Sequence, residues 1–92
     1  MPRDQAEKMQ EQTPEWEIEE EGILKLKKEF KFDDFASALE FVNKVGQIAE
    51  KEGHHPDIEF GWGKAVVTLW THAVGGLSEN DFILAAKINK LG

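Results

Sequence analysis

Residues 57–72 read DIEFGWGKAVVTLWTH, and this stretch predicts a β-hairpin because two alternating apolar runs flank a pair of glycines. The first strand alternates its apolar side chains at Ile58, Phe60 and Trp62. Gly61 and Gly63 mark a turn or a bulge. The second strand is expected to run to His72, with Ala65, Val67, Leu69 and Thr71 on one face and Val66, Thr68, Trp70 and His72 on the other.

A second hairpin and a helix are predicted before this stretch. Residues 16–19 alternate, Gly22 interrupts them, and residues 24–32 alternate again. A helix is then expected over residues 34–52, because Asp34 can cap its start and Gly53 can stop it. Its apolar stripe consists of Phe35, Ala38, Leu39, Val42, Val45 and Ala49, widened by Phe41 and Ile48.

A further helix is predicted after the second hairpin. Gly75 and Gly76 end the strand, Ser78 and Asp81 have the spacing of a capping box, and residues 82–91 are strongly apolar. The order ββαββα predicts an α+β, two-layer sandwich in which a four-stranded antiparallel sheet carries two main helices on one face. Residues 16–92 form this single domain, and the polar residues 1–15 form either a short helix or a tail.

Composition excludes several classes of function. The chain has 92 residues and a formal net charge of -7, which argues against nucleic acid as a partner. It has no cysteine, so it can form neither a disulfide framework nor a catalytic thiolate. No apolar run is long enough to cross a membrane, and we therefore expect a cytoplasmic protein without a membrane partner.

The three histidines are the candidate chemical groups. His54 and His55 follow the predicted helix, and Pro56 restricts His55 to an extended conformation. Adjacent side chains in an extended segment point in different directions, so this pair is poorly suited to holding one metal ion, and we expect none. Imidazoles titrate near neutral pH and can act as acid and base together with His72.

Other side chains could support such a site, although each has a plainer structural interpretation. Glu50 lies four residues before His54 and could orient an imidazole, or it could be one more charge on a solvated helix face. Trp16 and Trp62 could stack on a flat ligand, or they could belong to the core. The histidines themselves could cap the helix or lie at the surface, and Asp81 could simply begin the last helix.

The combined spacing resembles the signature of the pterin-4a-carbinolamine dehydratase family. The signature residues are Glu50, His54, His55, Pro56, Trp62, His72 and Asp81. The flanking runs FKFDDF at residues 30–35, LWTH at 69–72 and GGLS at 75–78 are also similar to the family. The likeness covers roughly residues 16–91. It departs mildly at Trp62, where the family often has Tyr, and in the polar residues before Trp16.

The resemblance implies a hydro-lyase that dehydrates 4a-hydroxytetrahydropterin (4a-hydroxytetrahydrobiopterin) to quinonoid dihydropterin and water, in pterin recycling. It implies no cofactor, since the pterin is the substrate, and a homodimer or homotetramer. His54, His55, His72 and Glu50 would be catalytic, and Asp81 and Trp62 supporting. The substrate would contact His54, His55, Pro56, Thr71, His72, Ala73, Val74 and Trp16. A non-catalytic protein-binding role, as a dimerisation cofactor or an assembly factor, is the alternative.

Overall fold

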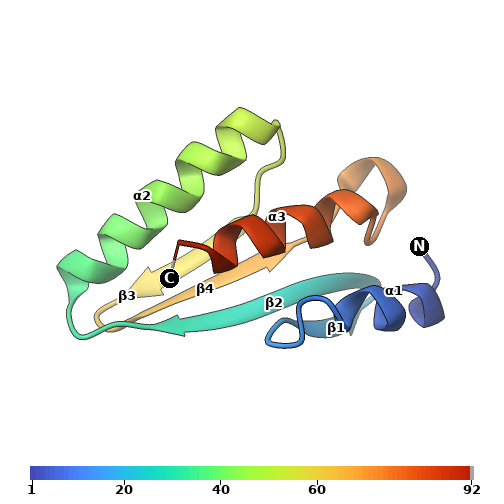
Figure 1. Cartoon of the computed structure of the whole chain (residues 1–92), viewed down its shortest axis with the longest axis horizontal. Helices are drawn as coiled ribbons and strands as arrows, with labels where there is room; N and C mark the ends of the chain where they lie inside the picture. Colours follow the sequence, from blue (N-terminus) through green and yellow to red (C-terminus); the bar gives the residue numbers. More distant parts are fainter. Residues whose placement is uncertain (92) are drawn as a thin grey trace.

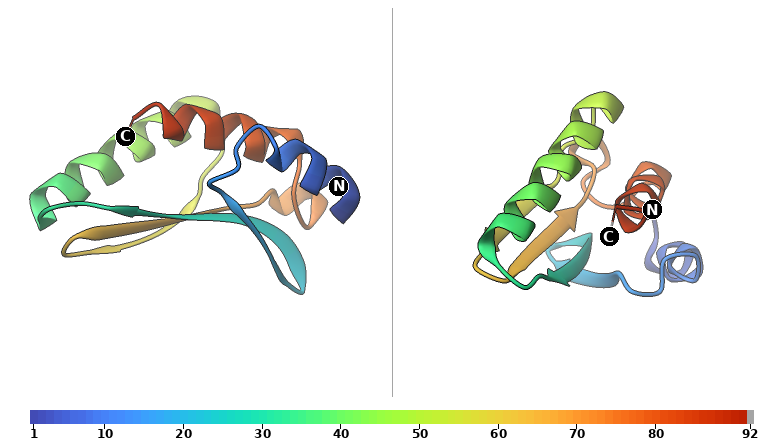
Figure 2. Two further views of the ribbon diagram at one scale, coloured as in Figure 1. Left: turned by 60° about the horizontal axis from the view of Figure 1, so that its bottom comes forward. Right: turned by 60° about the vertical axis from the view of Figure 1, so that its left-hand side comes forward.

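The computed structural model describes residues 1–91 and contains three α-helices and one four-stranded antiparallel sheet. The elements in chain order are α1 (Arg3–Gln10), β1 (Glu17–Glu21), β2 (Ile23–Lys31), α2 (Phe35–Glu52), β3 (Asp57–Gly61), β4 (Lys64–Leu69), the 3-10 helix η1 (His72–Val74) and α3 (Glu79–Asn89). The helices lie on one side of the sheet, whose other face is open (Figures 1 and 2). The predicted two-layer α+β fold is confirmed, and α1 resolves the choice between a helix and a tail. None of the helices in this part of the chain is long and apolar enough to cross a bilayer.

The sheet has the strand order β1-β2-β4-β3, so each predicted hairpin pairs its own two strands and β2 pairs with β4 in the centre. The prediction that Trp62 continues the first strand of the second hairpin is wrong. β3 ends at Gly61, and Trp62 and Gly63 form the turn. Gly63 has φ +79°, and a Cβ there would lie 3.3 Å from the Phe32 carbonyl oxygen, so glycine permits this tight reversal.

α2 begins and ends where the sequence predicts. The side chain of Asp34 accepts a hydrogen bond from the Ser37 backbone N–H at 2.7 Å, and Gly53 closes the helix in the left-handed conformation with φ +65°. Its buried face consists of Ala38, Phe41, Val45 and Ala49. Phe35 and Leu39, which the periodicity assigns to the apolar stripe, remain 46% and 39% exposed. The helix therefore packs through the Phe41 side of the stripe.

The chain between β4 and α3 is a compact loop. The sequence predicts that the strand continues to His72, and this prediction is wrong. β4 ends at Leu69, after which Thr71 and Gly76 form an isolated bridge around η1. The Thr71 backbone N–H donates to the Gly76 carbonyl at 2.7 Å, and Gly75 adopts φ +64°. This reversal takes His72 out of the sheet. α3 then starts at Glu79, three residues before the apolar run, because Ser78 and Asp81 form the predicted capping box.

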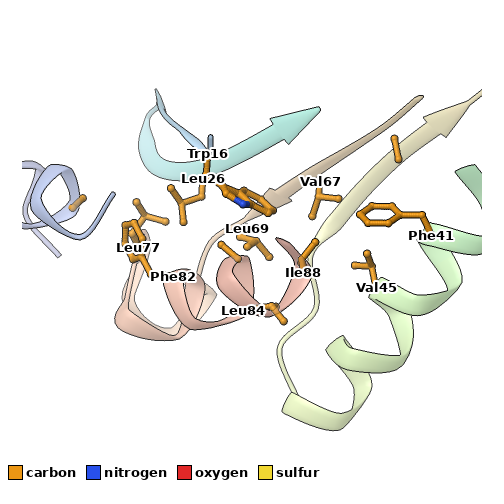
Figure 3. Packing of buried hydrophobic residues seen from close by; sticks show 13 residues of the cluster. Trp16, Leu26, Phe41, Val45, Val67, Leu69, Leu77, Phe82, Leu84 and Ile88 are labelled. Atoms are coloured by element: carbon orange, nitrogen blue, oxygen red, sulfur yellow. The ribbon is translucent and has the colours of Figure 1, made fainter. Parts of the chain in front are cut away.

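The core lies between the sheet and the helices (Figure 3). Its fully buried large side chains include Trp16, Leu26, Leu69, Leu77, Leu84 and Ile88. α1 adds Ala6, which is completely buried, and Met9 packs against the same cluster. The short N-terminal helix is thus held by contact with the domain core, since most of its own residues are polar.

Candidate active site

His54 is fixed at the junction between α2 and β3. Its backbone N–H donates to the Ala49 carbonyl at 3.0 Å, which anchors the residue to the last turn of α2. Its ring reaches across to the first turn of α3, where Nε2 lies 2.5 Å from Oδ1 of Asp81. The His54 side chain is 17% exposed and that of Asp81 is completely buried. One edge of this imidazole is therefore held by a buried carboxylate, while the residue keeps limited access to solvent.

Asp81 is the centre of a small polar network. Its Oδ2 accepts a hydrogen bond from the Ser78 backbone N–H at 2.9 Å and another from the Thr71 hydroxyl at 2.9 Å. The hydroxyls of Thr71 and Ser78 lie 2.8 Å apart. The sequence predicts Ser78 only as part of a helix cap, and the Ser-x-x-Asp spacing is local, so it gives no sign of this second contact with Thr71.

His55 points away from this network, as expected for successive residues of an extended segment. Its Nε2 pairs with Oε2 of Glu50, and the two side chains are 63% and 77% exposed. Glu50 therefore contacts His55 and not His54, while Asp81 takes the position beside His54. The two acidic residues singled out in the sequence each meet one histidine of the pair.

His72 lies in η1 and not at the end of a strand, which corrects the sequence-based placement. Its exposed ring lies 5.1 Å from the Trp70 ring, centroid to centroid, and the Lys25 amine lies 4.4 Å above that indole. Ala73 and Val74 follow it on the same exposed loop. The backbone places His72 directly after Thr71, so the loop that carries this histidine is tied through Thr71 to Asp81 and His54.

Two tryptophans expected near the histidines are not brought to them within the chain. Trp16 is completely buried in the core, and its Nε1 donates to Oδ1 of Asn89 at the far end of α3 from Asp81, at 2.9 Å. Trp62 is 76% exposed in the β3–β4 turn, at the opposite end of β3 from His55. A strand of this length separates the two ends by roughly 15 Å. The plainer interpretation, a core residue, therefore holds for Trp16, and Trp62 belongs to neither the core nor the histidine cluster.

The His54 side chain is partly exposed and borders a hollow in the surface. This small hollow of about 120 Å³ is also lined by Glu52, Gly53, Asn80, Ile83 and Leu84, and not by His55 or His72. Residues 1–91 contain no group of three or more histidine, aspartate or glutamate side chains arranged to hold a metal ion. What the site does offer is a carboxylate-bound imidazole, a second imidazole on the adjacent loop, and an exposed imidazole–carboxylate pair. Imidazoles and carboxylates are the side chains used most often for general acid–base catalysis.

Comparisons with known proteins agree on one family. The family model described as "Pterin 4 alpha carbinolamine dehydratase" matches residues 1–91. A relative from Halorhodospira halophila is 51% identical over 92 residues, covering 100% of this chain and 84% of its own length. A second, from Rubrobacter xylanophilus, is 47% identical over 88 residues, covering 96% and 80%. Both are provisionally named pterin-4-alpha-carbinolamine dehydratase.

Solved structures give the same fold. A crystal structure of a transcriptional coactivator/pterin dehydratase from Brucella melitensis superposes with a TM-score of 0.90 at 28% identity, covering 99% of this chain and 96% of that one. A pterin dehydratase-like protein identified as a RuBisCO assembly factor in the alpha-carboxysome gives a TM-score of 0.71 at 26% identity, covering 83% and 87%. From the full-length family match and the close relatives, we conclude that this chain belongs to the pterin-4a-carbinolamine dehydratase family of hydro-lyases.

Proposed function

We propose that this protein dehydrates 4a-hydroxytetrahydropterin to quinonoid dihydropterin and water by histidine general acid–base catalysis, as a step in pterin recycling. The observation that carries the proposal is the contact of His54 Nε2 with the buried carboxylate of Asp81, in a chain that retains all three histidines of the family signature. A base oriented by a buried carboxylate is a recurrent arrangement in proton-transfer sites.

The reaction explains why two imidazoles are needed. The substrate carries a hydroxyl on C4a and a hydrogen on the neighbouring N5. The lone pair of N5 forms the C=N bond as the C4a–O bond breaks, but hydroxide is a poor leaving group. One imidazolium must therefore protonate the departing oxygen, and one neutral imidazole must take the N5 proton. Water leaves, and the two histidines return to their starting states by exchanging protons with solvent.

We assign these two proton transfers to His54 and His72. His55, held by Glu50, would contribute to binding and to acid catalysis from the exposed side. The flat pterin would contact His54, His55 and Pro56 on one side. On the other it would contact His72, with Ala73 and Val74 acting through backbone groups. Thr71 would contribute through its backbone and methyl group only, because its hydroxyl is occupied by Asp81 and Ser78.

A homodimer or homotetramer is the proposed assembly. Phe35, Leu39, Phe60 and Trp62 are all exposed, and the Phe35 and Phe60 rings lie 5.5 Å apart, centroid to centroid. Phe60 lies in β3 and Trp62 in the turn directly after it, and β3 is an edge strand with no further partner strand within residues 1–91. Exposed apolar groups beside an unpaired strand edge favour association with a second copy of the chain.

The decisive experiment is an activity assay with 4a-hydroxytetrahydropterin generated by a pterin-dependent hydroxylase. We expect purified protein to accelerate the appearance of quinonoid dihydropterin above the spontaneous rate, and the activity to survive treatment with EDTA. A rate equal to that of the buffer blank would remove the dehydratase proposal. Activity lost with EDTA and restored by Zn²⁺ would replace the acid–base mechanism by a metal-assisted one.

The alternative is a non-catalytic, protein-binding role. Two structurally similar proteins carry a transcriptional coactivator or an assembly factor in their descriptions. The Asp81–His54 pair favours catalysis, because a docking surface has no need of a buried carboxylate that holds one edge of an imidazole. Absence of activity in the assay above, with the wild-type fold retained, would make the protein-binding role the leading one.

A further inference from the structure

The carboxylate of Asp81 is itself held in place by the Thr71 hydroxyl, from the loop after β4, and by the Ser78 backbone N–H at the N-cap of α3. Oδ2 accepts from the Ser78 backbone N–H and from the Thr71 hydroxyl, and Oδ1 faces His54 Nε2. Asp81 is completely buried, so no solvent replaces these partners. Every polar neighbour of the carboxylate can act as a donor, which is the environment of an ionised, acceptor-only group.

The direction of each hydrogen bond follows from this. Thr71 has one hydroxyl hydrogen, and it is donated to Asp81 Oδ2. The contact between Thr71 and Ser78 at 2.8 Å must then be donated by the Ser78 hydroxyl. The chain of donors runs from Ser78 to Thr71 to Asp81, and it fixes the rotation of the carboxylate so that Oδ1 is presented to His54.

Because Oδ1 of Asp81 is an acceptor, it determines which nitrogen of the His54 imidazole carries the hydrogen. His54 Nε2 must carry a hydrogen to bond to Oδ1. In the neutral imidazole the lone pair then lies on Nδ1, and Nδ1 makes no hydrogen bond with any other side chain in residues 1–91. Resting on the proposed dehydratase function, we propose that Thr71 and Ser78 are positioning residues that hold Asp81 so that His54 is kept as the Nε2–H tautomer, with Nδ1 as its proton-accepting atom.

The proposal specifies the step at His54. Nδ1 accepts the N5 proton of the carbinolamine, the N5 electrons form the C=N bond, and the C4a–O electron pair leaves with the oxygen. That oxygen takes a proton from the second imidazole, His72, and departs as water. The imidazolium formed at His54 is stabilised by the negative charge of Asp81, as in other carboxylate-supported bases. Solvent then removes the proton from His54 and returns one to His72.

The tautomer can be observed directly without substrate. In protein labelled with ¹⁵N at histidine, we expect neutral His54 to show a protonated Nε2 and an unprotonated Nδ1. Its Nε2 hydrogen should be shifted downfield and protected from solvent exchange by the buried carboxylate. His55 is an internal reference, since its exposed pair with Glu50 should exchange rapidly. A protonated Nδ1 on neutral His54 would overturn the proposal, whatever the activity of the enzyme.

Variants of Thr71 test the positioning role. Thr71→Val removes the hydroxyl and keeps the shape, so we expect kcat to fall about 10- to 100-fold, a range seen for residues that orient a ligating or reacting group. KM should change by less than about threefold, since the effect falls on proton transfer and not on binding. The protected His54 signal should be lost as well. Thr71→Ser, which restores the donor, should recover both kcat and the signal.

Two further variants separate positioning from general damage to the structure. Thr68→Val is the matched control, because Thr68 is a half-buried threonine on β4 outside the Asp81 network, and its kcat should be unchanged. Ser78→Ala should lower kcat less than Thr71→Val. It removes the Ser78 hydroxyl, which reaches the carboxylate only through Thr71, and it keeps the Ser78 backbone N–H that donates to Asp81 directly. A Thr71→Val protein with wild-type kcat and an unchanged His54 signal would refute the role of Thr71. If the Thr71→Val protein fails to fold, the ¹⁵N measurement on the wild-type protein still tests the assigned tautomer of His54.

Discussion

His54 and Asp81 are 27 residues apart in the sequence, and their side chains meet with Nε2 2.5 Å from Oδ1. The contact joins the end of α2 to the first turn of α3, where Asp81 is also part of the helix cap. One carboxylate thus stabilises the start of a helix and orients an imidazole. This dual role makes the geometry of His54 depend on how α3 packs against the rest of the domain.

The three histidines should differ in their effect on catalysis. We expect His54→Ala and His72→Ala each to lower kcat by about 100-fold or more, the usual contribution of a proton-transferring group. His55→Ala should have a smaller effect, because His55 is largely exposed and paired with the exposed Glu50. Steady-state kinetics of the three variants, with circular dichroism to check folding, makes the comparison. Wild-type rates for the first two would reassign them as structural residues.

Asn89 should be important for stability although it lies outside the site. Its Oδ1 accepts hydrogen bonds from the buried Trp16 Nε1 at 2.9 Å and from the Lys28 amine at 3.0 Å. Asn89→Ala would leave the indole N–H buried without a partner, at a cost of about 1–3 kcal/mol in the free energy of unfolding. Urea denaturation measures this change. Asn43→Ala, at an exposed position of α2, is the control, and equal losses in the two variants would show that the Asn89 contacts contribute nothing special.

The N-cap of α2 should make stability depend on pH in the acidic range. The backbone hydrogen bond from Ser37, followed by its side-chain hydrogen bond, lowers the pKa of Asp34 below its ordinary value of 3.8. A pKa that is lower in the folded state gives stabilisation that is complete above the unfolded-state pKa and is lost as pH falls through the folded-state pKa. Asp34→Ala should therefore be less stable than wild type at pH 7, by a margin that narrows below about pH 4.

The measurement for Asp34 is urea unfolding at a series of pH values and one protein concentration. Asp34→Asn is the control, because asparagine caps helices about as well as aspartate but does not titrate. The stability of this variant relative to Asp34→Ala should stay nearly constant across the same pH range. A gap between wild type and Asp34→Ala that does not change between pH 7 and pH 2.5 would contradict the assigned hydrogen bond.

Self-association should depend on the exposed aromatic side chains Phe60 and Trp62 beside the open edge of β3. We expect Phe60→Ser combined with Trp62→Ser to shift the protein towards the monomer, because the pair removes exposed apolar groups next to the open strand edge. Size-exclusion chromatography with light scattering gives the mass directly. Ile83→Ser is the matched control, since Ile83 is 47% exposed on α3 and should leave the mass unchanged. An unchanged assembly in the double variant would place the interface elsewhere.

The sequence by itself determined the local features of this protein. Alternation in residues 24–32 and 57–69, the Asp34 cap, the Gly53 stop and the Ser78–Asp81 capping box all act over a few residues, so their pattern predicts the elements and their order. The family signature also identified the histidines. The alternation of residues 65–72 predicts a strand that runs to His72, and this prediction is wrong because the backbone reverses after Leu69.

Only the tertiary structure decided which side chains meet. Asp81 reaches His54 because α3 packs beside the end of α2, and Glu50 is left to His55 because adjacent residues point apart. Trp16 is buried in the core, where its indole contacts Phe30 and donates to Asn89. Trp62 stays exposed because a glycine turn carries it beyond the strand. Sequence spacing does not predict these contacts, since contacts across 27 or 73 residues depend on the packing of whole elements.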